Sequence, residues 1–187
     1  IIVENLVTQN LKDATTFFDK SREKGHEGLI AKRLDSTYTV GIRGKNWFKI
    51  KHNLETLDLV IVAAERGHGR RHKWYSDYHL AVRDEESDEY VMIGKTFKGL
   101  TDDEFASMTE RLEQIQISKG RGIIKVKPKI VVEVLASEIQ DSPNYKSGMS
   151  LRFARIINIR LDKGPQEVTT LSELRSIYEN QFRFKAR

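Results

Sequence analysis

Cysteine is absent from the 187 residues, and proline occurs only three times. Without cysteine the chain forms no disulfide, no zinc–thiolate site and no thiol nucleophile. No apolar run approaches the roughly 20 residues that a membrane-spanning helix needs, so we expect no membrane partner. Disordered and collagen-like chains are excluded as well, because apolar residues make up 39% of the sequence and charged residues 32%. The size fits one globular domain, or one domain with part of another.

The sequence begins at Ile1 without a methionine, and its first five residues are too polar for a signal peptide. We therefore expect these residues to be part of a longer protein.

Basic residues gather in two stretches, although the net charge is only +5. Residues 43–73 hold eight lysines and arginines against three acidic residues, and residues 119–129 hold five against none. Acidic residues concentrate elsewhere, at 84–89 and 102–104. This segregation favours a positive face that binds phosphate, as in nucleic acid, with a solvated surface as the alternative.

Hydrophobic periodicity predicts three helices and several short strands. In the middle helix, Thr101 and Glu104 have the spacing of a capping box. The helices are expected at 12–24, 102–117 and 171–184. The strands are expected at 27–32, 47–51, 57–64, 78–83, 89–96, 129–138 and within 151–161.

Five of these strands follow a shift in composition near Asn53, with one helix between the third and the fourth. The predicted fold class is mainly β with helices (α+β). Its second part is typical of a five-stranded Greek-key barrel of the OB type, although other small barrels and α+β sandwiches have similar spacing.

Lys49 and Lys51 alternate with apolar residues on a predicted strand, which places both side chains on one face about 6.5–7 Å apart. A bound phosphate could bridge the two ammonium groups, and Arg43 on the preceding loop could reach the same place. The alternative is an exposed, solvated strand face.

Further candidate residues lie at strand ends. Glu27 heads a predicted strand, where a carboxylate can hold Mg²⁺ through water or remain an ordinary surface group. Arg160 and Asp162 share a face and Lys163 follows them, which fits a surface ion pair or a phosphate-facing group.

The loop after the third predicted strand is rich in arginine and glycine. Its glycines allow the chain to approach a nucleic-acid backbone closely. We therefore expect it to contact the phosphates of duplex DNA with little sequence preference. The basic residues concerned are Arg66, Arg70, Arg71 and Lys73.

Three segments together resemble the ATP-dependent DNA ligases of the archaeal and eukaryotic replicative type. Residues 27–32 (EGLIAK) resemble nucleotidyltransferase motif IV, residues 43–51 (RGKNWFKIK) motif V with its lead-in, and residues 152–163 (RFARIINIRLDK) motif VI. The likeness covers nearly the whole chain. Ala154 stands where the family usually has proline, and Leu161 where an acid is common.

The resemblance implies a division into two domains. Residues 1–53 would be the C-terminal part of an adenylation (nucleotidyltransferase) domain, and residues 54–187 an OB domain. In its first domain, Glu27 would bind the catalytic Mg²⁺, and Arg43, Lys49 and Lys51 would contact the adenylate or its α-phosphate.

The resemblance also implies a catalytic role for the end of motif VI. Arg160, Asp162 and Lys163 would close over ATP and orient the leaving pyrophosphate.

The activity implied is the sealing of 5′-phosphate/3′-hydroxyl nicks in duplex DNA, with ATP and Mg²⁺, through enzyme–AMP and DNA–AMP intermediates. The family's nucleophile is the lysine of Lys-x-Asp-Gly, and these residues contain no Asp-Gly pair. The isolated chain is therefore expected to be inactive in self-adenylation.

The same resemblance suggests the enzyme's setting. A role in DNA replication, repair and recombination is expected, with a monomeric enzyme and a sliding clamp reached through upstream regions. Its location would be cytoplasmic and nucleoid-associated in an archaeon, or nuclear in a eukaryote.

Two other functions share parts of this pattern. An RNA ligase or mRNA-capping nucleotidyltransferase has the same motif types. A non-catalytic OB module that binds single strands would need exposed aromatic residues for base stacking, and the sequence shows no clear aromatic stripe.

Overall fold

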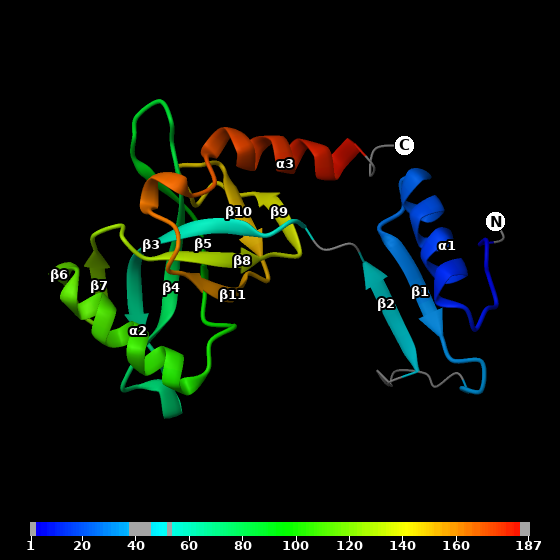
Figure 1. The fold of residues 1–187 in the computed structure, drawn as a ribbon, viewed down its shortest axis with the longest axis horizontal. Helices are drawn as coiled ribbons and strands as arrows, with labels where there is room; N and C mark the ends of the chain where they lie inside the picture. Colours follow the sequence, from blue (N-terminus) through cyan, green and yellow to red (C-terminus); the bar gives the residue numbers. More distant parts are fainter. Residues whose placement is uncertain (1–2, 38–45, 52–53, 184–187) are drawn as a thin grey trace. The chain divides into compact units, whose positions relative to one another are not determined.

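A computed structural model describes residues 3–37, 46–51 and 54–183 of the chain (Figure 1). The chain divides into two compact units, one of residues 1–52 and 179–187 and the other of residues 53–178. Among the described residues, no helix is long and apolar enough to cross a membrane.

The first unit contains one helix and a pair of antiparallel strands. Helix α1 (Leu11–Glu23) begins at Asn10, whose side chain accepts a hydrogen bond from the backbone N–H of Lys12. Strands β1 (Gly28–Lys32) and β2 (Trp47–Lys51) follow and pair with each other. All three predicted elements are confirmed within a residue or so. None of the described residues between 3 and 51 is buried.

The second unit is built on an antiparallel sheet with the strand order β11-β8-β3-β4-β5. These five strands, with a helix between the third and fourth in sequence, confirm the OB-type arrangement expected for a mainly β chain. Their bounds are Leu57–Arg66 (β3), Tyr75–Arg83 (β4), Tyr90–Thr96 (β5), Val131–Leu135 (β8) and Arg155–Arg160 (β11).

The two end strands of this order, β5 and β11, are linked by the residues just after β5. The backbone N–H of Ile156 donates to the carbonyl of Lys98 at 3.0 Å. Gly99 has φ +116°, and a Cβ atom there would lie 1.8 Å from the carbonyl oxygen of Ile156. Only glycine permits this conformation and so close an approach of two backbones.

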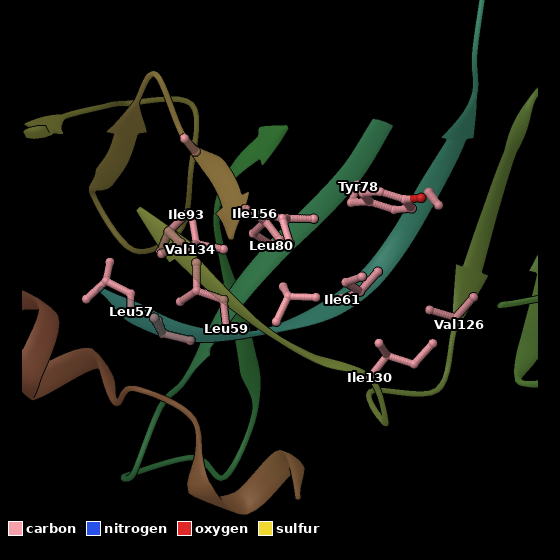
Figure 2. Packing of buried hydrophobic residues seen from close by; sticks show 14 of the residues in the cluster. Leu57, Leu59, Ile61, Tyr78, Leu80, Ile93, Val126, Ile130, Val134 and Ile156 are labelled. Carbon is pink, nitrogen blue, oxygen red and sulfur yellow. The ribbon is translucent and has the colours of Figure 1, made fainter. Parts of the chain in front are cut away.

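The core lies on the inner face of the sheet. Side chains alternate along β3, so Leu57, Leu59 and Ile61 point inward while Asp58 lies on the other face. Figure 2 shows the three apolar side chains gathered with those of Leu80 and other core residues.

Helix α2 (Asp102–Gln114) covers the core with Phe105, Met108, Thr109 and Leu112, which are all buried and recur at helical spacing. Its N-terminus has the predicted capping box between Thr101 and Glu104. The Thr109 hydroxyl also accepts from the backbone N–H of Tyr75 at 3.0 Å, which ties the helix to β4.

The terminal helix α3 (Leu171–Arg183) is confirmed, and its residues Leu171 and Leu174 are buried in the core.

Several short strands were not predicted. Helix α2 ends at Gln114 rather than 117, because the following residues form β6 (Gln116–Lys119), which pairs with β7 (Ile123–Val126). A second hairpin, β9 (Glu138–Asp141) with β10 (Met149–Arg152), lies outside the main sheet order. Strand β11 confirms the strand expected within 151–161, whereas β10 was not predicted and is separated from β11 by Phe153, with φ +54°.

We expect Gly99→Ala to lower the free energy of unfolding by about 3–4 kcal/mol, because left-handed strain adds to an overlap with backbone. Gly148 is a matched control, since it also has positive φ (+72°) but open space where a methyl group would lie. Gly148→Ala should cost only about 1 kcal/mol. Urea denaturation followed by circular dichroism measures both values, and equal losses would contradict the role of the Gly99–Ile156 contact.

Candidate functional site

Glu27, Lys49 and Lys51 come together at the β1–β2 pair. One carboxylate oxygen of Glu27 lies 2.7 Å from Nζ of Lys49 and 3.1 Å from Nζ of Lys51. The three side chains remain 40–54% exposed, so solvent and ligands can reach them. We call these three residues the lysine-pair cluster. The strand-face prediction for the two lysines is consistent with their shared partner.

The strand register explains how the cluster forms. Gly28 pairs with Lys51 and Ile30 with Lys49, so Glu27 stands next to the end of the opposite strand. Gly28 has φ +148°, and a Cβ atom there would lie 2.1 Å from the carbonyl oxygen of Ile50. The glycine thus allows the two backbones to meet beside Glu27. Arg43 lies outside the described residues.

The lysine-pair cluster carries one negative and two positive charges. Hydrogen bonds from Lys49 and Lys51 lower the pKa of the Glu27 carboxyl from 4.5 to about 2. The remaining positive charge suits an anion, and two adjacent ammonium groups could contact two oxygens of one phosphate.

Glu27 can hold Mg²⁺ only if a phosphate supplies further ligands to the ion. Among the described residues, no group of three or more histidine, aspartate or glutamate side chains could hold a metal ion. Glu27 alone offers one carboxylate, and both lysines already bind it. Mg²⁺ is nevertheless often held by a single carboxylate together with substrate phosphates and water, so Glu27 fits this ion if the lysines turn to the phosphate.

A second cluster lies in the other unit and contains Arg160, Asp162 and Lys163. The guanidinium of Arg160 donates through Nε and Nη2 to the two oxygens of Asp162, at 2.9 and 2.7 Å. Its Nη1 donates to Asp58 at 3.1 Å, and Nζ of Lys163 donates to the same carboxylate at 2.5 Å. Asp58 therefore joins the three predicted residues, and we call the four the Asp58 cluster.

Sequence reasoning missed Asp58, although a signal was present. It is the one acidic residue within the apolar run 57–64, and strand alternation places it opposite the core. Its side chain is only 15% exposed, whereas that of Asp162 is 65% exposed. The hydrogen bonds from Arg160 lower the pKa of Asp162 to about 2 and raise the pKa of Arg160.

The basic loop at residues 66–73 contains two kinds of side chain. Arg66 and Arg71 pack on the fold: their guanidinium carbons lie 4.6 Å from the ring of Tyr75 and 4.3 Å from the ring of Phe105. Arg71 also donates to the carbonyl of Phe97 at 3.0 Å.

The other two basic residues of this loop point outward. Arg70 is 76% exposed in its side chain, and Lys73 is exposed. These two are the better placed for phosphates.

Comparisons with known proteins add to this geometry. Residues 1–51 match the family model described as ATP dependent DNA ligase domain, and residues 71–163 match the model described as ATP dependent DNA ligase C terminal region. The first match contains the lysine-pair cluster, and the second contains Arg160, Asp162 and Lys163.

Curated relatives are similar along nearly the whole chain. The chain is 54% identical over 182 residues to DNA ligase 1 of Korarchaeum cryptofilum, covering 97% of this chain and 34% of the relative. It is 44% identical over 186 residues to the DNA ligase of Thermococcus onnurineus, covering 100% and 33%. The chain thus spans about a third of the length of these relatives.

Among solved structures, the ligase domain of M. tuberculosis LigD is similar, with 30% identity and a TM-score of 0.53. The similarity covers 83% of this chain and 51% of that one.

We expect the carboxyl of Glu27 to titrate near pH 2, as the two lysine contacts require. Its lowered pKa means that the charged, paired form persists above pH 4.5 and is lost as the pH falls toward 2. Replacing Lys49 and Lys51 by methionine should move the midpoint back toward 4.5, whereas Lys12→Met on α1 should not. Carbon-detected NMR titration gives these midpoints, and a normal value in the unsubstituted chain would argue against the cluster.

We expect Arg70→Ala and Arg71→Ala to have different effects. Loss of the Arg71 packing and hydrogen bond should lower the free energy of unfolding by about 2 kcal/mol, whereas Arg70→Ala should change it by less than about 0.5 kcal/mol. Arg70→Ala should instead weaken binding to any duplex and reduce the salt slope by roughly 0.9 if Arg70 contacts one phosphate. Denaturation and fluorescence anisotropy at several salt concentrations test this, and a duplex affinity unaffected by Arg70→Ala would contradict it.

Proposed function

Since the chain belongs to the ATP-dependent DNA ligase family, we propose that it serves in sealing 5′-phosphate/3′-hydroxyl nicks in duplex DNA through enzyme–AMP and DNA–AMP intermediates. The observation that carries the proposal is the pairing of Lys49 and Lys51 on one strand face within a segment that matches the family. In this proposal residues 1–53 complete an adenylation domain and residues 54–187 form the OB domain.

The lysine-pair cluster would act at the α-phosphate of ATP and then of AMP. Lys49 and Lys51, joined by Arg43, would bind its oxygens and stabilise the charge that develops during phosphoryl transfer. Glu27 would hold Mg²⁺, which neutralises phosphate charge when bound. This role would need a change of partner, in which the lysines leave Glu27 for a phosphate and free its carboxylate for the ion.

Arg160, Asp162 and Lys163 would act on the leaving group. Attack of a lysine nitrogen on the α-phosphate forms a P–N bond and breaks the P–O bond to pyrophosphate. Cations near the β- and γ-phosphates stabilise that departing charge. The nucleophile has to come from outside these residues, since the sequence has no Lys-x-Asp-Gly segment.

The grip on nicked DNA is assigned to the basic loop. The exposed Arg70 and Lys73 would contact phosphates directly, while Arg66 and Arg71 hold the loop against β4 and α2 and add to the local positive potential. Sequence preference should be slight, because phosphate contacts carry no base information.

A role in DNA replication, repair and recombination follows from nick sealing. We also propose a monomeric enzyme that meets a sliding clamp through regions outside this chain. An archaeal source would place it in the cytoplasm with the nucleoid, and a eukaryotic source in the nucleus.

The alternatives have less support. Tyr75 and Tyr78 are buried, and Trp74 is partly buried against the core. Stacking of single-strand bases in this unit would therefore be left to the exposed Phe97 and Phe153. An RNA ligase or capping enzyme would share the phosphate chemistry, and activity on nicked duplex DNA against RNA ends separates these enzymes.

The proposal is tested in a chimera in which residues 1–187 replace the matching third of the Korarchaeum cryptofilum relative. Lys49→Ala should slow single-turnover sealing of a nicked duplex by roughly a hundredfold, because a charged contact in the transition state is lost. Duplex binding should change less than about twofold, since one of many phosphate contacts is involved.

Two controls accompany this test. Lys12→Ala should seal at the unsubstituted rate, and the isolated chain should form no labelled adduct with radiolabelled ATP and Mg²⁺. A stable labelled band on the isolated chain would refute a nucleophile outside these residues. Unchanged sealing by Lys49→Ala would refute the assignment of Lys49 to the α-phosphate.

A further inference from the structure

Asp58 is a nearly buried carboxylate on the outer face of β3. Its neighbours Leu57 and Leu59 are fully buried in the core on the opposite face. The side chain of Asp58 is 15% exposed, less than either of the cations that bind it. Burying an unpaired carboxylate would cost much free energy, so the stability of Asp58 at this position depends on the cations that pair with it.

Two cations from a distant part of the chain share this carboxylate. Nη1 of Arg160 lies 3.1 and 3.3 Å from its two oxygens, and Nζ of Lys163 lies 2.5 Å from one of them. The two cations would repel each other if brought together without it. Asp58 therefore sets the positions of both side chains relative to each other.

The backbone of Asp58 is itself fixed. Its N–H donates to the hydroxyl of Thr169 at 3.2 Å, and its carbonyl accepts from the N–H of Thr169 at 2.8 Å. The strand also pairs with β8, where Glu133 stands opposite Asp58. The carboxylate is thus carried by rigid backbone, whereas Lys163 follows the end of β11 and has a long, flexible side chain.

Asp58 and Asp162 bind different nitrogens of the Arg160 guanidinium. Asp162 occupies the two-nitrogen edge of Arg160, is 65% exposed, and lies in the turn after β11. That edge matches the spacing of phosphate oxygens, so an arriving phosphate can replace Asp162 there. The bond from Nη1 to Asp58 does not compete for this edge and can persist.

We propose that Asp58 is a positioning residue, which holds Arg160 and Lys163 side by side so that both meet the departing pyrophosphate of ATP. The inference rests on the proposed function of these two cations. It adds a residue from the first strand of the OB unit to the nucleotide step, and it assigns none to the later sealing step.

The test compares two reactions of the chimera. One is formation of the enzyme–AMP adduct from ATP, and the other is sealing of a nick that already carries AMP, which needs no ATP. Asp58→Asn should slow adduct formation roughly tenfold, since hydrogen bonds to charged groups contribute an amount of that order. Sealing of the preadenylated nick should stay within about twofold. Combining Asp58→Asn with Lys163→Ala should slow adduct formation by less than the product of the two single effects, because both substitutions remove the Asp58–Lys163 contact while Asp58→Asn alone also weakens the contact with Arg160.

Controls separate positioning from loss of structure. Asp77→Asn removes another half-buried carboxylate, on β4, and should leave both reactions unchanged. Asp58→Glu keeps the charge and should recover part of the adduct rate. In the 187-residue chain, Asp58→Asn should raise the rate at which an amine-reactive ester labels Lys163, measured by mass spectrometry, severalfold relative to labelling of Lys12.

The outcomes distinguish the two proposals. If Arg160→Ala and Lys163→Ala slow adduct formation while Asp58→Asn does not, the positioning role is overturned and the proposed function stands. If neither cation matters for adduct formation, both are overturned. If Asp58→Asn slows both reactions equally, or Asp58→Glu recovers nothing while labelling of Lys163 is unchanged, Asp58 acts only in folding.

Discussion

Alternation of side chains along β3 is the constraint on which the second unit depends. The strand must bury Leu57, Leu59 and Ile61 to form the core, and this fixes Asp58 on the opposite face. A slip of one residue would move the leucines to the face that carries Asp58 and turn the carboxylate into the core. The same alternation that stabilises the fold therefore determines where Arg160 and Lys163 find their partner. Folding energy and site geometry are linked at this one strand.

The sequence predicted those features that depend on local patterns. Periodicity located all three helices, and the spacing of Thr101 and Glu104 revealed the N-terminus of α2. The β6–β7 pair was missed because its strands have four residues each, too few for a periodic signal. Strand β10 was missed because it also has only four residues and ends just before Phe153, a left-handed phenylalanine whose position no glycine marks.

In the candidate sites, too, the sequence predicted what depends on local spacing and missed what depends on tertiary pairing. Strand spacing placed Lys49 and Lys51 on one face, but only the β1–β2 register brings Glu27 to both. Asp58 and Lys163 are 105 residues apart, so no local pattern could join them. The basic loop could be recognised from composition, whereas the packing of Arg71 on Phe105 depends on a helix about 30 residues further along. Tertiary pairing decides which charged residues are available to a ligand and which support the fold.

The β6–β7 hairpin has a consequence for association between molecules. Among the described strands, β6 pairs with β7 alone, so its other edge presents unpaired backbone groups, and all four of its residues are exposed. Such an edge is a template for pairing with another chain. Lys119 on β6 and Lys125 on β7 place positive charge beside it, with Arg121 in the turn. Two identical hairpins would repel each other, so the basic character of this segment also opposes edge-to-edge aggregation.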